Sequence, residues 1–114
     1  MGLSESFKMG SLVRKNDGVW KPSKTKGVSS KLLRNNTALG ERALLLKLEP
    51  GTTYPAHKHN GGAQILVLEG EVRIGNDLLK AGDFLYTPPD AIHADHSEKG
   101  CVMFITAPEH PEMI

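Results

Sequence analysis

The sequence predicts an all-β domain, built as a β-sandwich or a barrel. Three observations lead to this fold class. Short runs of apolar and β-branched residues recur at a spacing of roughly ten residues, as in sandwiches and barrels. Clusters of Gly, Pro, Asn and Asp separate these runs and mark turns. No stretch has the 3.6-residue apolar period of an amphipathic helix.

The first strands are expected near residues 18–20 and 28–34. A Lys-Pro-Ser turn follows the first of them, and Asn35 and Asn36 form a turn that ends the second. Trp20 is expected to act as a lid on the core or as an interface anchor, because a large aromatic side chain is rarely left fully in water.

The next strand is expected at residues 42–48, where apolar side chains occupy both faces. Leu44, Leu46 and Leu48 share one face, and Ala43 and Leu45 lie on the other, so this strand is covered on much of both sides. Gly75-Asn76-Asp77 predicts a hairpin further along the chain. The remaining strands are expected at residues 64–68, 71–74, 78–79, 84–87, 92–97 and 101–106.

Two histidines in the stretch GTTYPAHKHNGG are the first sign of chemistry. His57 and His59 are two residues apart, so an extended strand points both to one face and Lys58 to the other. A third histidine, His93, ends the distant stretch GDFLYTPPDAIH. Neutral imidazoles that converge can share a divalent metal ion.

The two histidine stretches resemble the two sequence motifs of the cupin superfamily. The first motif is Gly, five residues, His-x-His, three or four residues, Glu, six residues and Gly, and it matches at Gly51, His57, His59 and Gly70. The second is Gly, five residues, Pro-x-Gly, two residues, His, three residues and Asn, and it matches at Gly82, Pro88 and His93. Together the motifs span residues 51–97, about two-fifths of the chain.

The chain departs from these motifs at three positions. Ala63 stands where the family has a metal-binding Glu, and an alanine side chain cannot coordinate a metal. Asp90 replaces the second motif's Gly, which is a mild change because Asp tolerates the positive φ of a turn. Ser97 replaces the motif's Asn.

The resemblance implies a double-stranded β-helix, the jelly-roll barrel of cupins, with His57, His59 and His93 as ligands of one divalent transition metal per chain (Fe, Zn, Ni or Mn). The segment around GGAQILVLEG is most similar to anti-sigma-factor-type cupins and to relatives of the three-His dioxygenases. Three completions of the site remain open. The three imidazoles act alone, Gln64 turns inward as a neutral ligand, or Asp95 serves as a carboxylate ligand or as an acceptor for a histidine N–H.

Other polar residues have lesser roles in this interpretation. Asp95 and Tyr86 are the only candidates for a general base, although a surface position is the simpler expectation for Asp95. His96 falls on the opposite face from His93, and His110 lies in the tail, so both are expected to face solvent.

Length and composition indicate one domain and exclude several functions. The 114 residues divide into a flexible arm (1–16), a single barrel (17–107) and a C-terminal tail (108–114). Residues 1–34 hold eight basic and two acidic residues, but no helix-turn-helix or aromatic-basic pattern accompanies them, so nucleic acid is not an expected partner. The sequence contains no apolar run long enough for a membrane span. The single Cys101 is expected to be a buried apolar residue and fits a cytoplasmic location.

Two main functional hypotheses follow. The first is a non-haem metal-dependent enzyme, dioxygenase-like, that acts on a small organic acid, diketone or phenol; zinc or nickel would instead favour isomerase or hydrolase chemistry. The second is a non-catalytic sensor or regulatory cupin that binds a metal or small ligand, and a third, weaker one is a structural cupin with an empty pocket. The apolar strand at residues 42–48 and Trp20 are consistent with a homodimer.

Overall fold

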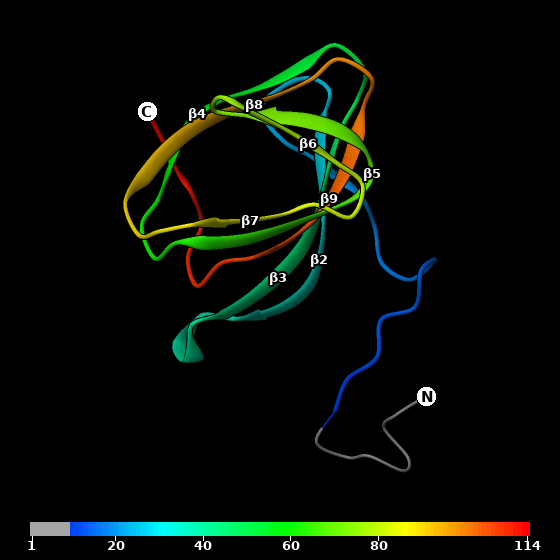
Figure 1. Cartoon of the computed structure of the whole chain (residues 1–114). Coiled ribbons are helices and arrows are strands. Elements are labelled where there is room, and N and C mark those ends of the chain that lie inside the picture. The colour runs from blue at the N-terminus through cyan, green and yellow to red at the C-terminus, as the bar shows by residue number, and fades with distance from the viewer. Residues whose placement is uncertain (1–9) are drawn as a thin grey trace.

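A computed structural model describes residues 10–114, which form a curled antiparallel sheet (Figure 1). Among these residues the single helical segment is a 3-10 turn, η1 (Thr37–Leu39). The strands are β1 (Lys21–Pro22), β2 (Val28–Asn36), β3 (Glu41–Leu48), β4 (Thr52–His59), β5 (Ala63–Ile74), β6 (Asp77–Lys80), β7 (Phe84–Thr87), β8 (Ala91–Ser97), β9 (Cys101–Thr106) and β10 (Glu112–Met113).

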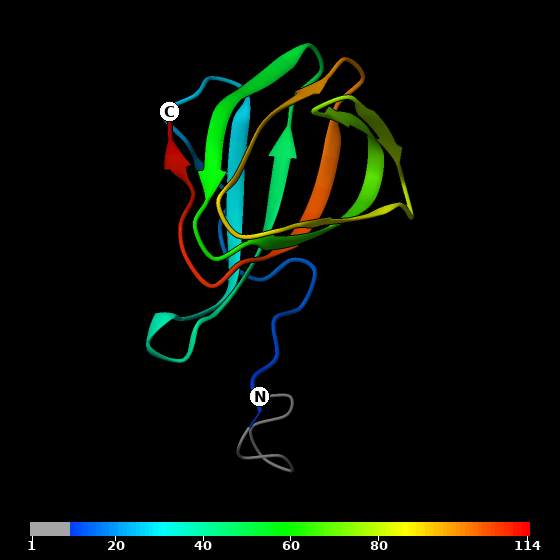
Figure 2. The same cartoon turned by 60° about the vertical axis from the view of Figure 1, so that its left-hand side comes forward.

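The sheet curls into a jelly-roll barrel, so the predicted fold class is confirmed. Its strand order is β1-β2-β3-β9-β5-β8-β4-β10, and β6 and β7 also pair with β5. The long strand β5 joins the two halves, because its first part pairs with β7 and β9 and its last part with β6 and β8. Figure 2 shows β2, β3 and β9 on one side of the barrel and β4 and β8 on the other.

The core follows the alternation of side chains along the strands. On β3, Leu44, Leu46 and Leu48 are buried as predicted, while Ala43 and Leu45 on the outer face are half-buried. The same pattern on β5 and β9 buries Ile65, Val67, Met103 and Ile105. Cys101 belongs to this core, as expected for a small apolar residue.

Gly70 ends the first histidine motif because β5 and β9 approach too closely there for a side chain. The register of this pair shifts between Val67 and Glu69, which bends β5. At Gly70 φ is +73°, and an added Cβ would collide with the carbonyl oxygen of Gly100. Only glycine satisfies both conditions.

Two turns in the second half of the chain form where the sequence predicts them. Gly75 and Asn76 form the two-residue loop of the β5–β6 hairpin. Asp90 has φ +69° in the corner before β8, so it takes the backbone conformation of the glycine that it replaces.

The N-terminal prediction is wrong in detail. Residues 18–20 form no strand, because Gly18 has φ +78°, and the first strand is instead the two-residue β1 at the edge of β2. Trp20 is half-buried, which is compatible with the expected lid or interface anchor, and the Lys47 ammonium lies 4.5 Å from its ring centroid. Of the predicted arm, residues 1–9 lie outside the described range. In the remainder, the Lys31 ammonium donates to the Lys15 carbonyl oxygen at 2.7 Å.

Strand ends differ from the predictions in two further places. β2 continues through Asn35 and Asn36, and the chain turns only at η1. No strand is expected in the tail, yet β10 pairs with the free edge of β4, with Met113 opposite His57 (Figure 2). Within residues 10–114, no helix has the length and apolar character needed to cross a membrane.

Candidate metal centre

Three imidazoles meet inside the barrel. His57 and His59 project from β4 and His93 from β8, and one ring nitrogen of each lies within 4.8 Å of the other two. The centroid of the His57 ring is 4.9 Å from that of His59 and 4.8 Å from that of His93. The centroids of the His59 and His93 rings are 5.0 Å apart. The structure therefore brings together the three residues that the sequence predicts as metal ligands.

The pairing of β4 with β8 produces this cluster. In the antiparallel register His57 lies directly opposite His93, so their side chains share the inner face. His59 follows on the same face, while Lys58 points outward and its ammonium lies 3.9 Å from the Glu112 carboxylate. The two-residue spacing in the sequence thus acts as predicted.

A β-bulge at Pro55 adds an aromatic ring to the cluster. Tyr54 pairs with Asp95 and His57 with His93, so three steps along β4 correspond to two along β8. The extra residue returns Tyr54 to the inner face, where its ring stacks on His57 with centroids 4.5 Å apart and an interplanar angle of 27°. Sequence reasoning missed Tyr54; the available signal was a proline inside a strand, which often marks a bulge.

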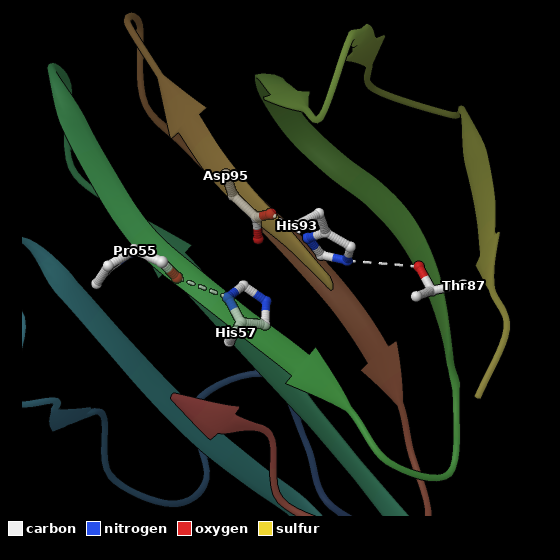
Figure 3. Close-up of polar contacts among 5 residues, drawn as sticks. All are labelled: Pro55, His57, Thr87, His93 and Asp95. Carbon is white, nitrogen blue, oxygen red and sulfur yellow. Dashed lines mark hydrogen bonds and ion pairs between the residues drawn. The ribbon is translucent and has the colours of Figure 1, made fainter. Parts of the chain in front are cut away.

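Two of the imidazoles are held by hydrogen bonds at Nδ1 (Figure 3). His57 Nδ1 donates to the Pro55 carbonyl oxygen at 2.8 Å, and His93 Nδ1 donates to Asp95 Oδ1 at 2.7 Å. The lone pair of a neutral ring then resides on Nε2, which leaves this nitrogen free to bind a metal. Thr87 Oγ1 is 3.5 Å from His93 Nε2, too far for a strong competing bond.

The third imidazole, His59, has buried ring nitrogens without partners. Neither Nδ1 nor Nε2 makes a hydrogen bond to any residue in the described range. Burial, with a smaller contribution from His57 and His93, lowers the pKa of His59 to about 4. Burial also lowers the pKa of His57. Neutral imidazole is the form that coordinates metals, and a buried nitrogen without a partner is costly, so this donor set fits a divalent transition metal.

A cavity of about 300 Å³ adjoins the cluster. His57, His59 and Tyr54 form part of its wall. The apolar part of the wall comes from both halves of the barrel and from the tail, and includes Leu44, Leu46, Ile65, Ile105 and Met113. Burial raises the pKa of the Tyr54 phenol, with Asp95 contributing, so the phenol stays protonated at neutral pH.

Of the remaining predicted site residues, Asp95 lies at the histidine cluster, whereas Gln64 and Tyr86 lie on the outer face of the barrel. Asp95 is only 2% exposed and accepts a hydrogen bond from His93 Nδ1, so the expectation of a surface position is wrong and the alternative of an acceptor for a histidine N–H agrees with the structure. Gln64 alternates with the buried Ala63 and is exposed on the outer face of β5. Tyr86, opposite Gln64 on β7, is 58% exposed on the same outer face. Neither Gln64 nor Tyr86 lines the cavity beside the histidines.

The two other histidines of the second half lie outside the cluster. His96 is partly exposed, with its ring nitrogens 2.7 Å from Thr53 Oγ1 and 3.0 Å from Glu98 Oε1. His110 is exposed at the edge of the cavity. Neither belongs to the group that could hold a metal.

Comparison with known families gives one match, which covers most of the chain. Residues 8–109 match the family described as the ChrR Cupin-like domain. No curated protein matches the chain.

Many solved structures share this fold. The acetylacetone dioxygenase of Acinetobacter johnsonii has 14% identity and a TM-score of 0.78, over 92% of this chain and 76% of that chain. The polyketide cyclase RemF of Streptomyces resistomycificus has 18% identity and a TM-score of 0.79, over 93% of this chain and 86% of that chain. A structure of Rhodobacter sphaeroides SigE in complex with the anti-sigma ChrR matches with 26% identity and a TM-score of 0.71, over 82% of this chain and 51% of that chain. The two enzymes are similar in fold alone.

Proposed function

Since the chain belongs to the ChrR cupin-like family, we propose that it is a small metal-dependent enzyme, dioxygenase-like, that acts on a small organic substrate. His57, His59 and His93 would hold one divalent transition metal per chain. The observation that carries the proposal is His59, whose two buried ring nitrogens have no partner in the described chain and which faces a cavity.

The metal defines the reaction class. Bound by the three histidines, Fe(II) would supply dioxygen chemistry, whereas Zn, Ni or Mn at the same site would supply mainly Lewis acidity. We propose Fe(II) as the catalytic occupant.

The protein's own groups would position the metal and the substrate. The bonds at Nδ1 of His57 and His93 fix the orientation of two rings. Ala63 contributes no carboxylate, so three neutral imidazoles would leave the full 2+ charge available to attract substrate oxygens. Tyr54 lines the cavity with a protonated phenol that can donate a hydrogen bond to such an oxygen.

Oxygen consumption tests this function. The protein is purified without chelator, its metal content is measured, and the chelated protein is reloaded anaerobically with Fe(II). Oxygen uptake is then followed with a panel of β-diketones, catechols and small organic acids. We expect uptake that requires both Fe(II) and one substrate class.

Variants assign the uptake to the site. His93→Gln should abolish both metal retention and oxygen uptake. His96→Gln, which changes a histidine on the outer face of the same strand, should retain both. Equal activity in the two variants would contradict the proposed ligand set.

A regulatory cupin is the second candidate function. The 26% identity to the structure that contains the anti-sigma ChrR favours it, although this chain spans only about half of that one. Tight zinc occupancy without oxygen uptake on any member of the panel would support a sensor and contradict the enzyme.

We further propose that the protein is a cytoplasmic homodimer. The half-buried outer face of β3, with Ala43 and Leu45, supports a dimer interface, and the buried Cys101 is compatible with a reducing compartment. Sedimentation velocity tests the dimer: a single species at the monomer mass at micromolar concentration would contradict it.

A further inference from the structure

Arg42 lines the cavity beside the histidine cluster, and its Nε is buried without a hydrogen-bond partner in the described range. Arg42 is two residues before Leu44 on β3, so the alternation of side chains places it on the inner face with Leu44 and Leu46. Its Nε is buried and makes no hydrogen bond to residues 10–114. Arg42 also forms no ion pair within this range, since the nearby Glu41 carboxylate is bonded to Arg34 at 2.9 Å.

A buried donor without an acceptor needs a reason. Native proteins pair nearly all their buried polar groups, and a guanidinium is among the most demanding of them, with five N–H donors in a planar fork. Burial lowers the pKa of Arg42, but an arginine keeps its charge at any physiological pH. An acceptor with negative charge would satisfy this N–H and also complement the charge of Arg42.

The charges around the cavity favour an anion as that partner. Arg42 and Lys24 contribute positive charge to the wall. The wall's single carboxylate within the described chain is Asp95, and it already accepts a hydrogen bond from His93 Nδ1. Ala63 adds no further negative charge near the cluster.

The shape and polarity of the cavity limit the anion to a small amphipathic molecule. At about 30 Å³ per water molecule, 300 Å³ corresponds to roughly ten waters. Leu44, Leu46 and Ile105 form an apolar wall next to Arg42, so an apolar body would lie well against them.

We propose that this cavity takes a small organic carboxylate with an apolar body, and that Arg42 binds the carboxylate group. The guanidinium would hold the two carboxylate oxygens with a bidentate, charge-assisted pair of hydrogen bonds. The remainder of the molecule lies against the apolar wall and reaches toward the three histidines. This inference rests on the proposed function, because it assigns the substrate class of the same site.

Benzoate and its neutral isostere benzamide distinguish charge from shape. Each is titrated by calorimetry into zinc-loaded protein, because zinc permits no redox turnover. Arg42→Met keeps the length of the side chain and removes the guanidinium. Arg34→Met is the matched control, because Arg34 is half-exposed and paired with Glu41 outside the cavity.

We expect the wild-type protein to bind benzoate at least about tenfold more tightly than benzamide. Arg42→Met should weaken benzoate binding by about tenfold to a hundredfold, the usual effect of losing a charged hydrogen-bond partner, and leave benzamide unchanged. Arg34→Met should behave as wild type. Thermal unfolding of Arg42→Met should stay at or above the wild-type midpoint, because the substitution removes an unsatisfied buried group.

Two results would overturn the inference, and they differ from failure of the metal site. Benzoate affinity equal in Arg42→Met and Arg34→Met, at full zinc occupancy, rejects Arg42 as the anion site and leaves the proposed function intact. Absence of zinc from the wild-type protein, measured in the same samples, rejects the proposed function itself. If Arg42→Met does not fold, Arg42→Lys replaces it: the benzoate-to-benzamide preference should fall, since lysine lacks the planar fork, and an unchanged preference overturns the inference.

Discussion

Tyr54 stacks on His57 although the two residues are three positions apart along β4, an odd offset that would place them on opposite faces of a regular strand. The bulge at Pro55 makes the stacking possible, because it inserts one residue into β4 and so places both side chains on the inner face. The same bulge directs the Pro55 carbonyl oxygen to His57 Nδ1. The bulge between Tyr54 and His57 therefore sets the environment and the tautomer of one imidazole, and β4 contributes to the site through this irregularity as well as through its alternation.

Asp95→Asn should weaken metal binding without removing it. The carboxylate fixes the ring of His93 and makes it a better donor, and such supporting groups typically change metal affinity by about 10–100-fold. Competition with a fluorescent zinc chelator measures the effect. Asp77→Asn, at an exposed position on β6, should bind zinc as wild type does. Equal affinities in the two variants would show that the contact with His93 has no role in metal binding.

The metal-free protein should lose stability as the pH falls below about 6.5. His59 has a pKa of about 4 when folded and 6.5 when unfolded, so between these values the unfolded chain binds more protons and acid favours unfolding. At 1.36 kcal/mol per pKa unit the shift corresponds to roughly 3 kcal/mol, lost progressively between pH 6.5 and 4. Urea unfolding of chelated protein at several pH values measures this slope.

His59→Gln serves as the comparison for the pH experiment. Without a titrating group at position 59, its free energy of unfolding should fall less steeply over the same range. His110→Gln, at an exposed tail position, should keep the wild-type slope. The same steepness in all three proteins would rule out burial of a neutral His59 as the source of the acid sensitivity.

Much of this architecture could be predicted from local sequence. β7 and β9 have the expected bounds, and the apolar parity of β3 places Leu44 and Leu46 in the core. His57 and His59 share a face because side chains alternate along any strand. Such features depend on neighbours in sequence, and the prediction of a jelly-roll barrel follows from them together with the motif resemblance.

Features that depend on distant parts of the chain were missed. The surface position expected for Asp95 is wrong because β8 delivers this residue beside His93, although the sequence did offer it as an acceptor for a histidine N–H. β10 exists because β4 presents a free edge, which the tail sequence does not reveal. Arg42 resembles any polar residue at the start of a strand until the cavity beside it is known.

Ala63→Glu should change stability in opposite directions with and without metal. Ala63 is buried at the position of the family's acidic ligand, so a glutamate there introduces a charge that needs a cation. In chelator the melting temperature should fall by several degrees relative to Ala63→Gln, its neutral counterpart. With excess zinc the order should reverse, because the carboxylate becomes a ligand. The same order of melting temperatures in both conditions would place position 63 out of reach of the metal.

Gly70→Ala should destabilise the barrel much more than Gly75→Ala. Both glycines have positive φ, +73° and +60°, but a Cβ at Gly70 meets the backbone of β9 whereas one at Gly75 meets open space. The strain of a positive φ costs about 1 kcal/mol in each case, and the backbone collision at Gly70 adds to it. Denaturant unfolding of the two variants gives the difference, and equal losses would mean that the β5–β9 contact is not tight.

The central claim is that three neutral imidazoles from two strands hold one metal ion without a carboxylate ligand. Anomalous diffraction from crystals of protein purified without chelator tests it most directly, because it identifies the element and its position together. We predict one peak per chain, about 2.1 Å from a ring nitrogen of each of His57, His59 and His93. A metal-reconstituted crystal with no peak among these three rings, or with a peak held by other residues, would contradict the claim.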